Sequence, residues 1–295
     1  MLEKFLDYLS VEQRYSPHTI ASYKRDLQDF SNFHLEKESR SNIISADKIH
    51  IRNFIFHCGE KDLSKRTINR KLSSLRSFYN FLLKINEIES SPVETIKSLK
   101  SFPEKQIPYS QDEMEEMLKL WENKEITTLE KLILETLYQT GVRKAELCDL
   151  LLKNLDLDNH QLKINGKGNK ERLVPISKEL NDLFKKFLTG RKPLPSEKEY
   201  FFINKKGKKV NQQFVYRVVN KYLSFVTIKK KKNPHSLRHS FATHLLENGA
   251  EISKVKELMG HSSLASTQVY TDANIEQLKK VFNNAHPRAK DNEEK

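Results

Sequence analysis

Four residues near the C-terminus have side chains that could transfer a phosphoryl group: His235, Arg238, His261 and Tyr270. A separation of three places His235 and Arg238 on one face of a helix. Arginine offers a planar fork of donors that matches phosphate oxygens, and histidine can transfer a proton near neutral pH. A tyrosine phenol, with an ordinary pKa of about 10, needs nearby positive charge to act as a nucleophile. The set therefore suits phosphoryl transfer through a phosphotyrosine intermediate.

Two helices must bring these residues together. The first helix starts at Pro234, after which apolar residues recur at helical spacing. The second helix is predicted over Ile252 to Met259, and Gly260 ends it. Taken singly, each residue has a more common structural explanation, because helical histidines usually pack or face solvent. Spacing alone therefore leaves both interpretations open.

Further upstream, Gly141 breaks a strongly apolar helix predicted over Leu129 to Tyr138, and Arg143 begins the next helix. Free amides at a helix start add donors for an anion, although an exposed arginine is the commoner case there. Residues 154–176 then change to a period of two, which predicts a small antiparallel sheet with a hairpin at Gly166 to Lys170.

Several blocks in this half of the chain resemble the signature of the tyrosine recombinase (phage integrase) family, and most closely its Xer subfamily. They are T-G-V-R-K-A-E-L from 140, I-N-G-K-G-N-K-E-R-L-V-P-I from 164, H-S-L-R-H-S-F-A-T-H-L from 235, L-M-G-H-S-S from 258 and T-Q-V-Y-T from 267. The family often has serine where Ala145 stands, which leaves the arginine match intact. The resemblance implies these catalytic residues: Arg143, Lys167, His235, Arg238, His261 and Tyr270.

The same resemblance implies their roles. Tyr270 is the nucleophile, the two arginines clamp the phosphate, and Lys167, rather than Lys163 or Lys170, protonates the leaving 5′-oxygen. Glu146 matches an acidic position that orients the site. The resemblance implies site-specific cutting and rejoining of DNA through a 3′-phosphotyrosyl intermediate, with no cofactor, ATP or metal.

The implied partners are a double-stranded DNA recombination site and a second Xer-type recombinase in a cyclic tetramer or heterotetramer. A septum-anchored DNA translocase is a further implied partner, since the implied process is chromosome dimer resolution for segregation at cell division. A cytoplasmic, bacterial protein, nucleoid-associated when active and without a membrane partner, is expected. The short helix expected over Ile275 to Phe282 would dock on the neighbouring recombinase.

Composition agrees with a DNA partner. The chain has 295 residues, 52 Lys and Arg against 39 Asp and Glu, and a formal net charge of +13, which favours a polyanion. Cys58 and Cys148 are too far apart in sequence for a CxxC motif, so neither a zinc ribbon nor a disulfide framework is indicated. No signal-peptide core and no apolar run of transmembrane length is present in the sequence.

Residues 1–85 predict a bundle of helices. Ser16-Pro17 is a helix start, and Ser64 begins a helix whose apolar stripe includes Leu72 and Leu75. The other face of that helix is polar and is expected to meet DNA phosphates or a groove: Arg66, Asn69, Arg70, Ser73 and Arg76. The runs S-P-H-T-I-A-S-Y-K-R-D-L and L-S-S-L-R-S-F-Y-N-F resemble the family's core-binding (SAM-like) domain.

The predicted fold is therefore mainly α with a small antiparallel sheet, in two domains. An N-terminal helical core-binding domain (1–88) precedes a proline- and lysine-containing linker (89–108), an α+β tyrosine recombinase catalytic domain (109–285) and a tail (286–295). A helix over Asn211 to Val226 would help to read the major groove, as in the family.

Three alternatives stay open. A phage or transposon integrase would share the chemistry, and a catalytically inactive relative would bind DNA without cutting it. A zinc hydrolase would use His235 and His239, but Ser236 stands where an H-E-x-x-H motif requires glutamate.

Overall fold

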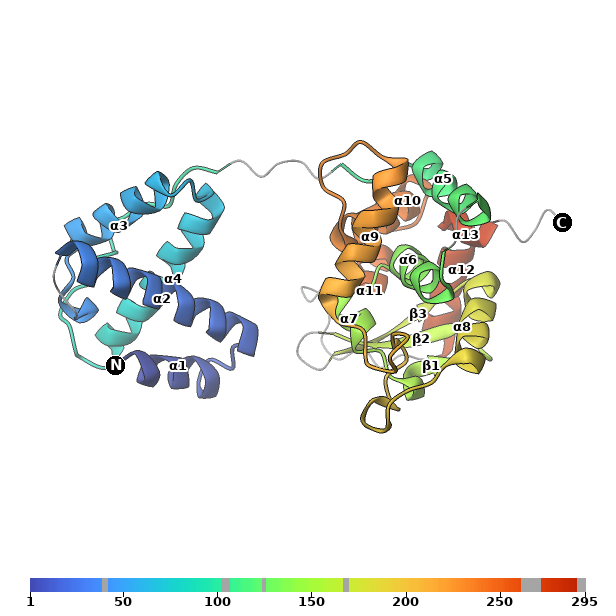
Figure 1. Cartoon of the computed structure of the whole chain (residues 1–295), viewed down its shortest axis with the longest axis horizontal. Helices are drawn as coiled ribbons and strands as arrows, with labels where there is room; N and C mark the ends of the chain where they lie inside the picture. Colours follow the sequence, from blue (N-terminus) through green and yellow to red (C-terminus); the bar gives the residue numbers. More distant parts are fainter. Residues whose placement is uncertain (39–41, 102–106, 124–125, 167–169, 261–271, 291–295) are drawn as a thin grey trace. The chain divides into compact units, whose positions relative to one another are not determined.

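The chain forms two compact units, Met1–Glu104 and Lys105–Lys295 (Figure 1). The computed structural model describes residues 1–38, 42–101, 107–123, 126–166, 170–260 and 272–290. Within these ranges both units are helical, and a three-stranded antiparallel sheet lies in the second. This confirms the predicted mainly-α fold class with its small sheet.

The first unit contains four α-helices and a 3₁₀ turn within its described residues. They are α1 (Leu2–Val11), α2 (Pro17–Glu38), η1 (Ile43–Ser45), α3 (Lys48–Glu60) and α4 (Lys65–Lys84). The expected start signals are used: the Ser16 hydroxyl accepts from the Thr19 amide at 3.3 Å, and the Ser64 hydroxyl accepts from the Thr67 amide at 3.2 Å. The predicted stripe of α4 is buried, including Leu72 and Leu75 at 1% exposure each.

The segment after α4 packs back onto the first unit. Val93 and Ile96 are buried in its core. The side-chain amide of Asn69 donates to the Leu99 carbonyl at 2.9 Å and accepts from the Leu99 amide at 2.8 Å. Residues 93–99, assigned to the linker by sequence, thus contact the helical bundle.

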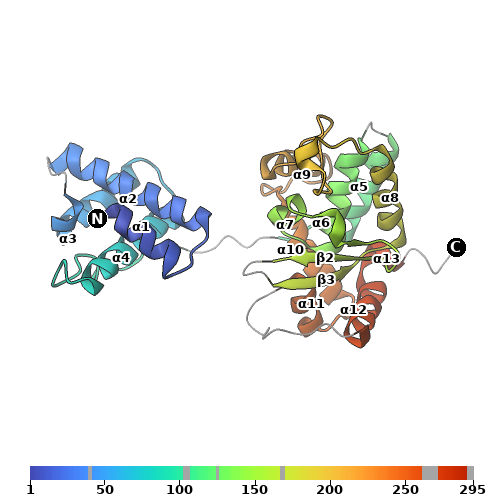
Figure 2. The ribbon, with the colours of Figure 1, turned by 90° about the horizontal axis from the view of Figure 1, so that it is seen from below.

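The second unit carries the sheet. Its elements are α5 (Gln111–Asn123), α6 (Thr128–Thr140), α7 (Lys144–Cys148), η2 (Leu152–Asn154), β1 (Leu155–Asp156), β2 (Gln161–Asn165), β3 (Glu171–Pro175), α8 (Lys178–Gly190), η3 (Pro195–Glu197), α9 (Gln212–Val226), α10 (Pro234–Glu247), α11 (Ile252–Met259), α12 (Asp272–Ala285) and α13 (Pro287–Lys290). The strand order is β1-β2-β3, and both pairings are antiparallel. The predicted hairpin between β2 and β3 is confirmed, and α11 and α12 pack against β3 (Figure 2).

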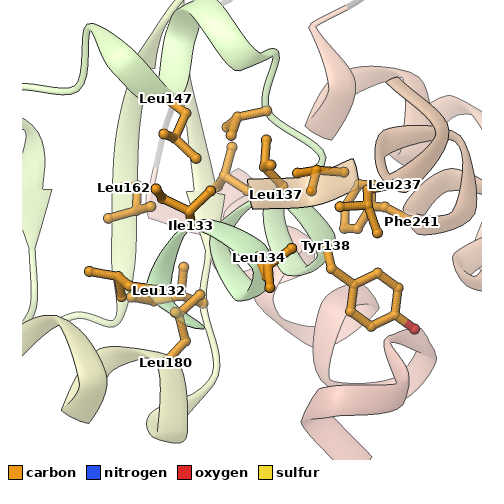
Figure 3. Close-up of a cluster of buried hydrophobic side chains, with 14 of the residues drawn as sticks. Leu132, Ile133, Leu134, Leu137, Tyr138, Leu147, Leu162, Leu180, Leu237 and Phe241 are labelled. Carbon is orange, nitrogen blue, oxygen red and sulfur yellow. The ribbon is translucent and has the colours of Figure 1, made fainter. Parts of the chain in front are cut away.

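Helix α6 runs through the core of this unit. Its apolar side chains are buried on several sides of the helix, as expected for a helix with no solvent face. Figure 3 shows α6 leucines between Leu162 of β2, Leu180 of α8 and Leu237 and Phe241 of α10. The helix thereby fixes the positions of its neighbours, including the segment that follows its C-terminus.

Helix α12 corrects one expectation. Its apolar face was expected to dock on a neighbouring protomer, but Leu278 and Phe282, at 1% and 0% exposure, belong to the core of their own unit. His286 and Arg288, assigned to the tail, are also buried there. The local sequence hid this outcome because α12 packs on α10, α11 and β3, while His286 and Arg288 contact Tyr138 and Glu135 of α6.

No helix among the described residues is both long and apolar enough to cross a membrane.

Candidate active site

Arg143 lies where the chain turns from α6 into α7. Gly141 ends α6 in the left-handed conformation (φ +57°), and a Cβ there would collide with the Phe241 ring, so glycine is required on two counts. Arg143 then occupies the N-cap position of α7, and its side chain keeps 44% of its surface exposed. A cation is therefore presented to solvent at the start of α7.

Glu146 holds Arg143 in place from one turn further along. Its carboxylate accepts from the Arg143 backbone amide at 2.9 Å and from the Arg143 guanidinium at 2.7 Å. Burial raises the pKa of Glu146, but hydrogen bonds from Arg172 and Arg143, with the charge of Arg172, lower it below the ordinary value. Glu146 is thus an ionised, buried anchor, consistent with the orienting role expected for it.

Arg238 comes from α10 and is 4% exposed. Its guanidinium donates to the Gly141 carbonyl and, at 2.5 Å, to the Met259 carbonyl at the end of α11. Burial, followed by the charges of Arg143 and Arg172, lowers the pKa of Arg238 to about 9, so it stays cationic at neutral pH. Arg238 therefore joins the turn before Arg143 to the end of α11.

His235 lies one turn before Arg238 on α10. The Asn233 side chain caps this helix by accepting from the Ser236 amide at 3.0 Å, and Pro234 takes the first position, as the sequence predicted. Burial, then the charges of Arg238, His239 and Arg143, lower the pKa of His235 below its ordinary value. His235 is therefore neutral at physiological pH and able to accept a proton.

Lys167, His261 and Tyr270 lie outside the described residues. The structure does describe the residues that come directly before two of these segments, Gly166 and Gly260. The Gly166 amide donates to the Lys170 carbonyl at 2.7 Å across the hairpin, and Gly260 ends α11 with φ +64°. Of the sequence candidates, the structure thus brings Arg143, His235 and Arg238 within electrostatic reach of one another.

Sequence reasoning gave no role to Arg172, which lies on β3. It is 4% exposed and donates to both oxygens of Glu146, at 3.2 and 2.7 Å. Arg143 and Arg172 thus both bind this carboxylate, and Arg238 lies within electrostatic reach of it. The excess positive charge can bind an anion such as a phosphodiester.

The polar face of α4 is less free than the sequence indicated. Asn69 and Arg76 hold the segment after α4, with Arg76 donating to the Ile96 carbonyl at 2.5 Å. Arg70 pairs with the fully buried Asp26. Arg66 remains exposed on this face. Within the described residues no group of His, Cys, Asp and Glu is arranged to hold a metal ion.

Comparison with known proteins identifies the class. Residues 109–277 match the model of the phage integrase family, and residues 2–86 match that of the phage integrase N-terminal SAM-like domain. The chain belongs to the phage integrase family, and within it to the Xer tyrosine recombinases. It is a site-specific DNA recombinase that acts by DNA cleavage and rejoining.

Two curated relatives illustrate the match. The tyrosine recombinase XerC of Thermodesulfovibrio yellowstonii is 36% identical, over 99% of this chain and 98% of its own length. The tyrosine recombinase XerC of Listeria innocua is 37% identical, with 97% of each chain covered. The alignments thus span both units.

Solved structures share the fold. The XerH site-specific recombinase bound to a palindromic difH substrate aligns with a TM-score of 0.71 and 23% identity, covering 95% of this chain and 82% of that one. The Tn1549 transposon integrase in complex with circular intermediate DNA aligns with a TM-score of 0.69 and 21% identity, covering 94% and 97%. A site-specific recombinase and a transposon integrase therefore have this same fold.

Proposed function

We propose that Tyr270 attacks a DNA phosphodiester, forming a 3′-phosphotyrosyl bond and releasing a free 5′-hydroxyl. Arg143 and Arg238 hold the non-bridging oxygens and stabilise the charge of the transition state. The observation that best supports this proposal is the arrangement of the two cations. Arg238 donates a hydrogen bond to the carbonyl two residues before Arg143, and Glu146 fixes the guanidinium of Arg143. Fixed donors of this kind need no rearrangement when charge develops.

Three further residues are assigned roles, two of them in proton transfer. Lys167 protonates the leaving 5′-oxygen, His235 takes part in proton transfer, and His261 donates a hydrogen bond to the phosphate. The lowered pKa of His235 supports its assignment, because a neutral imidazole can accept the phenol proton of Tyr270. The phosphotyrosyl bond then retains the energy of the phosphodiester, so a 5′-hydroxyl from another strand can reverse the step without ATP or a metal ion.

The cellular role proposed is the resolution of chromosome dimers for segregation at cell division. It is supported by near full-length relatives that carry the name XerC. The partners proposed are a double-stranded recombination site, a second Xer-type recombinase in a cyclic tetramer and a septum-anchored translocase. The location proposed is the cytoplasm, on the nucleoid during recombination.

The proposed domain limits are 1–88, 109–285 and a linker between them. Because His286 and Arg288 are buried in the second unit, the second domain is extended to residue 290, and the tail, proposed from sequence as 286–295, begins after it.

A mobile-element integrase is the second candidate, because a transposon integrase has the same fold. A plasmid assay separates the two. Two copies of candidate terminus-region DNA on one plasmid should recombine when the protein and its partner recombinase are supplied. Recombination only between the ends of a mobile element would support the integrase instead.

A suicide substrate tests the chemistry itself. A duplex nicked close to the cleavage position loses the short strand that bears the 5′-hydroxyl, so the covalent complex accumulates. An SDS-resistant complex on the 3′-phosphate side is expected. A protein that binds this DNA without forming the complex would be an inactive relative.

A further inference from the structure

Arg172 is a cation buried in the sheet. In the β2–β3 register Ile164 lies opposite Arg172 and Leu162 lies opposite Val174, so Arg172 shares the core-facing side with apolar residues. A buried ion pair is expensive to desolvate, and an apolar replacement of both partners is often neutral or stabilising. The apolar packing of the sheet alone therefore gives no reason for an arginine at this position.

Its first contact is with Glu146. Arg172 donates to both carboxylate oxygens, and the same carboxylate also binds Arg143. Because the negative charge is shared, Arg143 is oriented without being fully neutralised. If Arg172 were absent, Glu146 would pair with Arg143 alone and would draw that cation away from a phosphate.

Its second contact is with the end of α11. Arg172 Nε donates to the Leu258 carbonyl at 2.8 Å, and Arg238 donates to the next carbonyl, that of Met259, at 2.5 Å. The last carbonyls of a helix have no partner within the helix, so two arginines cap this C-terminus. A Cβ on Gly260 would lie 3.0 Å from Arg172 Cδ, which shows how closely the arginine supports this turn.

We propose that Arg172 is a positioning residue for DNA cleavage. It sets the orientation and free charge of Arg143 through Glu146, and with Arg238 it fixes the end of α11, from which the chain continues to His261. The proposal rests on the phosphate-binding role proposed for Arg143 and extends it to a residue that does not touch the DNA.

The test compares Arg172→Met with Arg172→Lys, which keeps a charge but loses the fork of donors. The matched control is Lys163→Met, which removes a half-exposed cation from the adjacent strand of the sheet. The melting midpoint of each variant is measured first. Covalent-complex formation on nicked DNA is then followed at saturating protein, well below each midpoint, while one-site binding is measured by gel shift.

Arg172→Met should form the complex on the order of a hundredfold more slowly, since small displacements of catalytic groups have effects of that size. Arg172→Lys should be intermediate, and in both variants one-site binding should change by no more than about threefold, a smaller loss than a typical single contact. Lys163→Met should match the unaltered protein. If Arg172→Met does not fold, Arg172→Lys carries the comparison.

Two results would overturn the proposal: a folded variant that cleaves at the native rate, or a loss of cleavage that follows the melting midpoint alone. Arg143→Ala belongs in the same series. If Arg143→Ala cleaves normally, the role proposed for Arg143 fails, whereas normal cleavage by Arg172→Met with slow cleavage by Arg143→Ala rejects only the role of Arg172.

Discussion

Arg238 donates a hydrogen bond to the carbonyl oxygen of Gly141, the residue that ends α6 two positions before Arg143. The two candidate phosphate-binding arginines are separated by almost a hundred residues in sequence, yet one is bound to the turn that presents the other. This contact makes their relative position a property of the packed core rather than of a flexible loop.

Removing either arginine should therefore slow cleavage and leave the fold in place. Arg143→Ala and Arg238→Ala should each slow covalent-complex formation by a hundredfold or more, roughly 3 kcal/mol in transition-state energy. Because Arg238 also binds two backbone carbonyls, Arg238→Ala should lower the melting midpoint more than Arg143→Ala does. Single-turnover cleavage and thermal melting check this, and native-like cleavage by either variant would exclude that arginine from the phosphate site.

Cleavage should be independent of divalent metal. The proposed chemistry uses only arginine, lysine, histidine and tyrosine side chains, so excess EDTA should leave the rate of covalent-complex formation unchanged. The measurement is a time course on nicked DNA with and without chelator, followed by added Mg²⁺. Dependence on the added ion would contradict the mechanism.

Helix α12 should contribute to the stability of its own unit. Phe282 is completely buried, so Phe282→Ala should cost about 3–5 kcal/mol of unfolding free energy. Asn283→Ala, on the exposed side of the same helix, is the control and should change little. Denaturant unfolding of both proteins provides the measurement. A Phe282 variant as stable as the control would mean that the helix packs elsewhere in solution.

The second unit should lose stability in mild acid through His286. Burial lowers the pKa of His286 to about 3, while a histidine in the unfolded chain titrates near 6.5. Protonation therefore favours the unfolded state, so this contribution is complete above about pH 6.5 and is lost as the pH falls towards 3. Melting midpoints measured from pH 7.5 to 4.5 should fall.

The histidine variants identify the source of that fall. His286→Phe keeps the aromatic packing on Phe282 and Tyr138 but cannot be protonated, so its midpoint should depend less on pH. His160→Asn, at a half-buried turn, is the matched histidine control. If both variants keep the native slope, other groups cause the acid sensitivity.

Local patterns in the sequence predicted the elements that carry the site. The helix ends were found where the sequence predicted them: Pro234 starts α10, Gly141 ends α6 and Gly260 ends α11. These signals are strong because each depends on a few adjacent residues. The catalytic roles of Arg143 and Arg238, by contrast, were implied by the family resemblance and not by these local signals.

Contacts between distant segments escaped prediction. Arg172 was missed because Leu173 and Val174 are adjacent apolar residues, so the alternation on β3 does not say which side faces the core; pairing with β2 decides it. Asn69 and Arg76 were expected to face DNA, but residues 96–99 return to bind them.

The central claim is that Tyr270 is the nucleophile, and peptide mapping of the covalent complex tests it most directly. The complex formed on nicked DNA is digested with protease and nuclease, and the nucleotide-bearing peptide is sequenced by mass spectrometry. We predict a 3′-phosphonucleotide on Tyr270, and no complex with Tyr270→Phe despite normal DNA binding. A nucleotide attached to any other residue, or attached through its 5′-phosphate, would contradict the account.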